Sequence, residues 1–113
     1  MTGKWIMFTI VETEIFEWLW PYYWTEQVHD EFISFITENP EVGDVVRGSG
    51  GIRKVRWGKP GSGKSGGVRV IYFNRLAYGE IWLVLIYSKN KQDSIDAKIL
   101  KEIKHEIEKT IDW

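Results

Sequence analysis

Residues 58–65 read GKPGSGKS, which fits the G-x-x-x-x-G-K-[ST] pattern of loops that bind nucleotide phosphates. Such a loop needs a helix directly after it, because the free N–H groups of the helix N-terminus face the phosphates. Here Ser65 is followed by two glycines and a β-branched run, which predicts a strand. The stretch therefore predicts a hairpin loop and not an ATPase or GTPase site. Lys59 and Lys64 remain candidates to contact a phosphate of a nucleic acid.

The cations are concentrated in the middle of the chain, although the net charge is only -1. Residues 1–46 hold nine acids against Lys4 alone, whereas residues 47–79 hold no acid. The cations of residues 47–79 are Arg47, Arg53, Lys54, Arg56, Lys59, Lys64, Arg69 and Arg75. Cations beside aromatic rings on a sheet suit RNA, because charge binds phosphates and ring faces stack on bases. A solvated sheet face that pairs with the acidic half explains the same composition equally well.

Hydrophobic patterning predicts the elements that would carry these cations. Strands are expected at residues 6–12, 52–57, 66–74 and 80–88, and helices at residues 14–20, 26–38 and 95–111. Thr25 suits the N-cap of the second helix, and Asn39-Pro40 ends it. The order β-α-α-β-β-β-α predicts an α+β fold, with a small antiparallel sheet and helices packed on one side. At 113 residues, the chain is expected to form a single domain over residues 1–113.

Composition excludes several other classes of protein. The chain has no Cys, so disulfides and thiolate metal sites are excluded. No apolar run approaches the roughly 20 residues of a membrane span, and no signal core follows the N-terminus. A cytoplasmic protein without membrane contact is expected.

Three stretches resemble a known family. They are NPEVGDVVRGSGGIRKVRW at residues 39–57, GKSGGVRVIYF at 63–73 and IYSKNK at 86–91. In this order they closely resemble the RelE/HigB toxins of bacterial type II toxin-antitoxin systems, and the HigB branch above all. The likeness covers roughly residues 8 to 105.

The resemblance implies a RelE-like fold and a ribosome-dependent endoribonuclease, or mRNA interferase. Such a toxin cleaves mRNA in the ribosomal A site and inhibits translation. It also implies a cognate antitoxin, often with a helix-turn-helix DNA-binding domain, so that operator DNA is contacted only indirectly. No metal or cofactor is implied, because RNA is cleaved by its own 2'-hydroxyl while the enzyme aligns the attack and stabilises charge on the phosphate.

Site residues follow from the matched positions. Arg69 matches the family's central catalytic arginine, and its bidentate fork would stabilise the transition-state phosphate. Lys54 and Arg56 match the family's paired basic positions and share one strand face. As catalytic residues they would bind the scissile phosphate or assist proton transfer. The loop after the last strand supplies Lys91 as a further catalytic cation. The residues predicted to bind RNA are Arg53, Lys59, Lys64, Tyr87, Lys89 and Asn90.

Other polar and aromatic residues have less defined roles. The general base is unassigned, because His29 and His105 lie on helices and are expected at the surface or at a partner. Tyr72 is expected to pack. Among the tryptophans, Trp18 and Trp57 are expected in the core, whereas Trp20, Trp24 and Tyr23 are candidates for an antitoxin contact. Trp113 has no predicted role.

Two other functions remain open. The first is a non-catalytic RNA- or ribosome-binding module on the same fold, favoured by the lack of a clear acid or base. The second is nucleotide hydrolysis through residues 58–65, which the missing helix disfavours.

Overall fold

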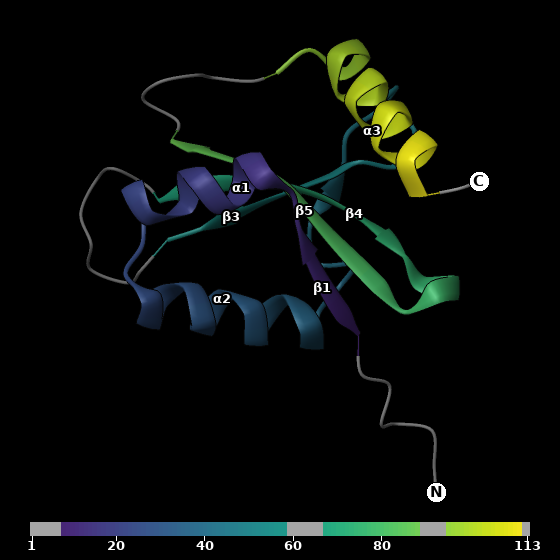
Figure 1. Cartoon of the computed structure of the whole chain (residues 1–113). Coiled ribbons are helices and arrows are strands. Elements are labelled where there is room, and N and C mark those ends of the chain that lie inside the picture. The colour runs from purple at the N-terminus through teal and green to yellow at the C-terminus, as the bar shows by residue number, and fades with distance from the viewer. Residues whose placement is uncertain (1–7, 59–66, 89–94, 112–113) are drawn as a thin grey trace, which may run out of the picture.

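The chain folds around one mixed sheet (Figure 1). The structure, a computed structural model, describes residues 8–58, 67–88 and 95–111. The strands are β1 (Thr9–Glu12), β2 (Asp44–Val45), β3 (Arg53–Trp57), β4 (Val68–Arg75) and β5 (Glu80–Ser88). Their order across the sheet is β1-β5-β4-β3-β2. Strands β2 to β5 pair antiparallel, whereas β1 runs parallel to β5 at the edge.

Three helices accompany the sheet within the described residues: α1 (Glu14–Leu19), α2 (Glu26–Glu38) and α3 (Ala97–Ile111). The 3-10 turns Trp20–Tyr22 and Leu76–Tyr78 connect neighbouring elements. Thr13 caps α1 and Thr25 caps α2, each accepting a hydrogen bond from a backbone N–H of the first turn. The Thr25 cap confirms the predicted start of the second helix.

Each face of the sheet carries its own hydrophobic core, because side chains alternate along the strands. On one face, α1 and α2 pack on Val55, Val70, Tyr72 and Leu83, with Phe16 and Phe32 fully buried between them. We call this the α1/α2 face. On the other face, α3 packs through residues such as Leu100 and Ile103 on a cluster comprising Ile52, Ile71, Phe73, Val84 and Tyr87. We call this the α3 face, and Figure 1 shows α3 apart from α1 and α2.

The predicted α+β class and the order of the seven predicted elements are confirmed, with the short β2 in addition. Two details of the arrangement differ. The first strand is parallel to β5, so the sheet is mixed, and α3 covers the opposite face from α1 and α2. Local periodicity predicts neither feature. It shows which side of an element is apolar, but not which face of the sheet a helix covers or how an edge strand is oriented.

The connection from β3 to β4 corresponds to the phosphate-loop pattern of the sequence. The two strands pair antiparallel from Trp57 and Val68 onward, so the chain continues as a strand where a nucleotide-binding loop requires a helix. Gly67 has a φ of 74°, and a Cβ there would lie 2.4 Å from the Trp57 carbonyl oxygen. Only glycine suits the position at which the chain enters β4.

The turn at residues 40–43 is fixed to the sheet by buried polar groups. The Tyr72 hydroxyl donates to the Pro40 carbonyl and accepts from the Gly43 N–H, both at 2.9 Å. Asn74 Nδ2 also donates to the Pro40 carbonyl, at 2.7 Å. The Asn39-Pro40 and Gly43-Asp44 segment of the family-like stretch therefore has a structural role, because it holds the edge of the sheet at β2.

Candidate nucleic-acid interface

Three of the predicted site residues form one row across the central strands. Arg56 on β3 lies opposite Arg69 on β4, and Arg69 lies opposite Tyr87 on β5. Strand alternation places all three side chains on the α3 face, beside Ile52 and Ile71 of its core. Side chains that lie directly opposite have Cβ atoms about 4.5–5.5 Å apart. We call Arg56, Arg69 and Tyr87 the cation row, because their side chains lie side by side on this face.

Lys54 lies one step from the cation row on the same face. It pairs with Ile71 on β4 and with Asp44 on β2. Because Lys54 and Arg56 are two residues apart on β3, the prediction that they share a strand face is confirmed. Lys54 is thus placed to add a fourth polar group beside the row.

The cation row is not neutralised by the part of the chain that the structure describes. No ion pair there joins Lys54, Arg56 or Arg69 to a carboxylate. Two arginines directly opposite one another on a sheet are unfavourable, because like charges repel. Arrangements of this kind are typical of sites that bind an anion.

Two polar atoms of the row are buried without a partner in the described chain: Arg69 Nη1 and the Tyr87 hydroxyl. Tyr87 as a whole is only 6% exposed. A buried polar group that lacks a hydrogen bond costs about 1–3 kcal/mol, so native proteins rarely keep one without a functional reason. Both groups therefore keep an unused hydrogen-bonding capacity on this face of the sheet.

The environment of Tyr87 also sets its protonation state. Burial raises the pKa of the Tyr87 hydroxyl above its usual 10.0, and the neighbouring Arg69 cation opposes this effect without cancelling it. Tyr87 is therefore protonated at neutral pH and can donate a hydrogen bond from this site.

Arg53 lies apart from the cation row, although the sequence predicts it as an RNA contact. It projects to the α1/α2 face, where Nη1 donates to the carbonyl oxygens of Gly43 at 2.6 Å and Glu41 at 3.0 Å. Arg53 thus fixes the turn before β2. Its predicted RNA contact stays a prediction, separate from the cation row.

The other predicted site residues lie outside the described residues. These are Lys59, Lys64, Lys89, Asn90 and Lys91. Their predicted contacts with RNA stay predictions. Strand β4 begins and strand β5 ends beside the cation row, because Val68 and Ser88 pair one step beyond Arg69 and Tyr87.

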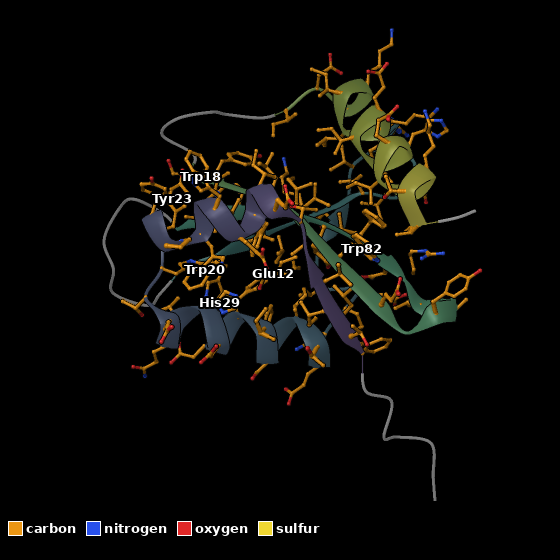
Figure 2. All side chains as sticks on the ribbon, viewed as in Figure 1. Glu12, Trp18, Trp20, Tyr23, His29 and Trp82 are labelled. Carbon is orange, nitrogen blue, oxygen red and sulfur yellow. The ribbon has the colours of Figure 1, made fainter. Side chains whose placement is uncertain are left out.

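The structure also brings together two residues that the sequence did not connect. His29 Nε2 lies 2.6 Å from Glu12 Oε2, with the side chains only 16% and 14% exposed. The His29 ring stacks on Trp20 at 4.1 Å, between α1 and α2 (Figure 2). The expectation of a surface His29 was therefore wrong. In the sequence, the hint of a partner for His29 was the Glu12 carboxylate at the end of the first strand. Only the packing of α2 brings His29 next to it.

The tryptophans are distributed differently from the prediction. Trp18, expected in the core, is 66% exposed, whereas Trp24, a candidate partner contact, is 8% exposed. Trp57 packs against the α1/α2 core, as predicted. Tyr72 is fully buried, which confirms its predicted packing role. His105 is exposed on α3, as expected.

Residues 8–58, 67–88 and 95–111 lack two further kinds of feature. No cluster of His, Asp and Glu there has the composition and spacing to hold a metal ion. None of the described helices combines the length and apolarity needed to cross a bilayer.

Comparison with known proteins supports the fold. No family model matches the chain. Among solved structures, an arginine-substituted mutant of the Escherichia coli toxin RelE in its free state aligns with a TM-score of 0.58 and 14% sequence identity. The alignment covers 88% of this chain and 97% of that chain. This chain has the RelE-like fold. At this identity the likeness supports the fold alone.

Proposed function

We propose that the protein is a ribosome-dependent mRNA endonuclease that cleaves mRNA in the ribosomal A site and so inhibits translation. The observation that carries the proposal is the cation row, with its unpartnered Arg69 Nη1 and Tyr87 hydroxyl on a RelE-like sheet. The close resemblance of residues 39–57, 63–73 and 86–91 to RelE/HigB toxins, and to the HigB branch above all, supports the same function.

The residues of the row fit the chemistry of RNA cleavage by the 2'-hydroxyl. In that reaction the 2'-oxygen forms a bond to phosphorus, and the bond from phosphorus to the 5'-oxygen breaks. Arg69, with Arg56 opposite it, would bind the non-bridging oxygens and stabilise the charge that grows on them. Lys54 would hold the same phosphate from one step along the sheet, and Lys91 stays a predicted fourth cation.

Tyr87 is suited to assist departure of the leaving group, and not to activate the attacking 2'-hydroxyl. Its hydroxyl is protonated at neutral pH, as in any tyrosine, and burial raises its pKa further. It would therefore donate a hydrogen bond to the departing 5'-oxygen, which must gain a proton when the bond breaks. The group that removes the proton from the 2'-hydroxyl is unassigned.

The partners follow from the same proposal. Translating ribosomes and mRNA are the substrate complex, which places the protein in the cytoplasm. A cognate antitoxin, with a helix-turn-helix domain that binds the operator, would silence it. A neighbouring reading frame that encodes such a small protein would support this partner.

The test is primer extension on a defined mRNA, incubated with the purified protein with and without translating ribosomes. We expect discrete cuts within codons that require ribosomes. Arg69→Ala should reduce cleavage roughly 100- to 1,000-fold, the usual cost of removing one group that stabilises an oxyanion. Lys109→Ala on α3 is the charge-matched control and should cleave normally. Circular dichroism verifies that both variants are folded.

A non-catalytic RNA- or ribosome-binding module is the alternative. It is favoured by one observation: among the strand partners of the cation row and of Lys54 there is no histidine to act as a base, and the one carboxylate, Asp44, lies opposite Lys54 and not beside Arg69. If a folded protein leaves mRNA intact in every lane yet co-sediments with ribosomes, and Arg69→Ala weakens that binding, the alternative replaces the nuclease.

A further inference from the structure

Helix α1 and the turn after it expose an apolar surface on a small domain. Ile15, Trp18 and Tyr22 are 51%, 66% and 72% exposed, and we call these three residues the α1 patch. Their spacing of three and four residues places them on one side of a helical segment. Figure 2 shows Trp18 on the side of α1 away from α2, whereas Trp20 and His29 lie between the two helices. Exposed aromatic clusters of this kind mark interaction sites.

The rings of the α1 patch are already arranged for binding. Trp18 and Tyr22 contact each other edge to face, with centroids 5.8 Å apart and an interplanar angle of 67°. A partner would therefore lose little ring entropy on docking, and Trp and Tyr are the residues that most often dominate binding energies.

The structure beneath the patch is well packed and hydrogen-bonded. Phe16 anchors α1 in the core with no exposed surface. Thr13 caps the helix and donates from Oγ1 to the Val84 carbonyl at 2.8 Å. Behind the patch, Trp20 stacks on His29, whose Nε2 contacts Glu12 at 2.6 Å. The α1 patch is thus a preformed surface and not a loosely held helix.

Charge decides what the α1 patch binds. Glu14 and Glu17 are exposed on the same helix. Residues 8–25, which carry the patch and are described throughout, contain Glu12, Glu14 and Glu17 and no Lys or Arg. A nucleic acid would be repelled from such a surface, and so would a second copy of the same acidic face. The complementary occupant is a polypeptide segment that combines apolar anchors with Lys or Arg.

We propose that the α1 patch docks a basic, apolar segment of a partner protein. The patch belongs to α1, which packs on the α1/α2 face, whereas the cation row lies on the α3 face. A short segment bound at α1 would not cover the α3 face. The proposal therefore does not depend on the nuclease function and is tested separately from it.

The experiment pans a random-peptide library, displayed on phage, against the full chain. Selected peptides are then synthesised, and their dissociation constants are measured by calorimetry. We expect enrichment of sequences that pair aromatic or aliphatic residues with Lys or Arg. Trp18→Ala should weaken the selected peptides by roughly 30-fold, the effect of a dominant interface residue. Glu14→Gln with Glu17→Gln should weaken them less and reduce the dependence on salt.

Matched controls and contrary results are available in the same chain. Tyr78→Ala removes a ring that is 70% exposed outside the patch, and it should leave peptide binding unchanged. Selection of peptides without basic residues, or binding indifferent to Trp18→Ala, would overturn the proposal. So would a dimer, or binding of an RNA oligonucleotide, that Trp18→Ala abolishes. Cleavage of mRNA is scored independently: its absence from the unmodified protein counts against the nuclease and leaves the docking result standing.

Discussion

At the scale of single residues, the cation row is an arrangement that folding alone would not favour. Arg56 and Arg69 face each other across β3 and β4, and Arg69 Nη1 is buried without a partner in the described chain. Both features cost stability, and neither is offset by an ion pair of Arg56 or Arg69 among the described residues. Residues that lower the stability of the fold but suit a catalytic role are expected at functional sites.

This reasoning separates the stability of Arg69 variants from their activity. Arg69→Ala removes one of two facing cations, so we expect the free energy of unfolding to stay the same or rise by up to about 1 kcal/mol. The measurement is urea denaturation followed by tryptophan fluorescence, beside the cleavage assay. A loss of stability larger than about 1 kcal/mol would mean that Arg69 is a structural residue.

The buried hydroxyl of Tyr72 predicts a pH dependence of stability. Burial raises the pKa of Tyr72 above its usual 10.0, although the hydrogen bond from Gly43 and the charge of Arg53 act in the opposite direction. The folded state therefore holds this proton more tightly than the unfolded chain does. The resulting stability is complete below pH 10 and is lost as the pH rises through the higher folded pKa.

We accordingly expect the free energy of unfolding to fall less steeply above about pH 10 in Tyr72→Phe than in the unmodified protein. Urea denaturation at a series of alkaline pH values measures the two slopes. Tyr78→Phe, which alters an exposed ring, is the control. Parallel slopes in Tyr72→Phe and the unmodified protein would contradict the assignment.

At the scale of elements, the β3–β4 hairpin positions the cation row, because Arg56 and Arg69 are its first facing pair after Trp57 and Val68. The entry to β4 depends on Gly67, where a Cβ would collide with the Trp57 carbonyl. A shift of the strand by one residue would turn Arg69 to the other face of the sheet.

Gly67→Ala tests this entry. The positive φ and the 2.4 Å approach to the Trp57 oxygen together should lower the free energy of unfolding by more than about 1 kcal/mol and reduce mRNA cleavage. Gly79→Ala is the matched control, since Gly79 has a φ of 71° but open space around it. It should be destabilised less and should cleave normally. Equal effects at the two glycines would show that backbone strain alone decides the outcome.

At the scale of the whole molecule, one sheet is stabilised from both sides. Phe32 is fully buried in the core under α1 and α2, and Leu100 is buried in the core under α3. The two cores share the strands β4 and β5, which contribute residues to both. Unfolding of either layer should therefore expose the sheet to water and unfold the other.

Core truncations test this coupling. We expect Phe32→Ala to cost about 3–5 kcal/mol and Leu100→Ala about 2–5 kcal/mol. Each variant should unfold in one transition, with coincident curves from far-ultraviolet circular dichroism and from fluorescence. Ile99→Ala, at a half-exposed neighbour of Leu100, should cost much less. Two separate transitions in Leu100→Ala would indicate that α3 unfolds independently.

Much of this protein follows from local sequence. Alternation placed Lys54 and Arg56 on one strand face, and Thr25 marked the start of α2. The run of residues 80–88 predicted β5 with the bounds that the structure gives. These features depend on neighbours a few residues apart, where the period of a strand or helix and the chemistry of a cap act directly.

The tertiary structure decided what distant segments do to one another. In the folded chain, β1 runs parallel to β5 and α3 packs on the face opposite α1 and α2. Trp18 is exposed, and His29 contacts Glu12. The tertiary structure also aligned Arg56, Arg69 and Tyr87 in one row. Local patterning shows which side of an element is apolar, but register and layer order come from long-range pairing and burial, whose free energies depend on the whole chain at once.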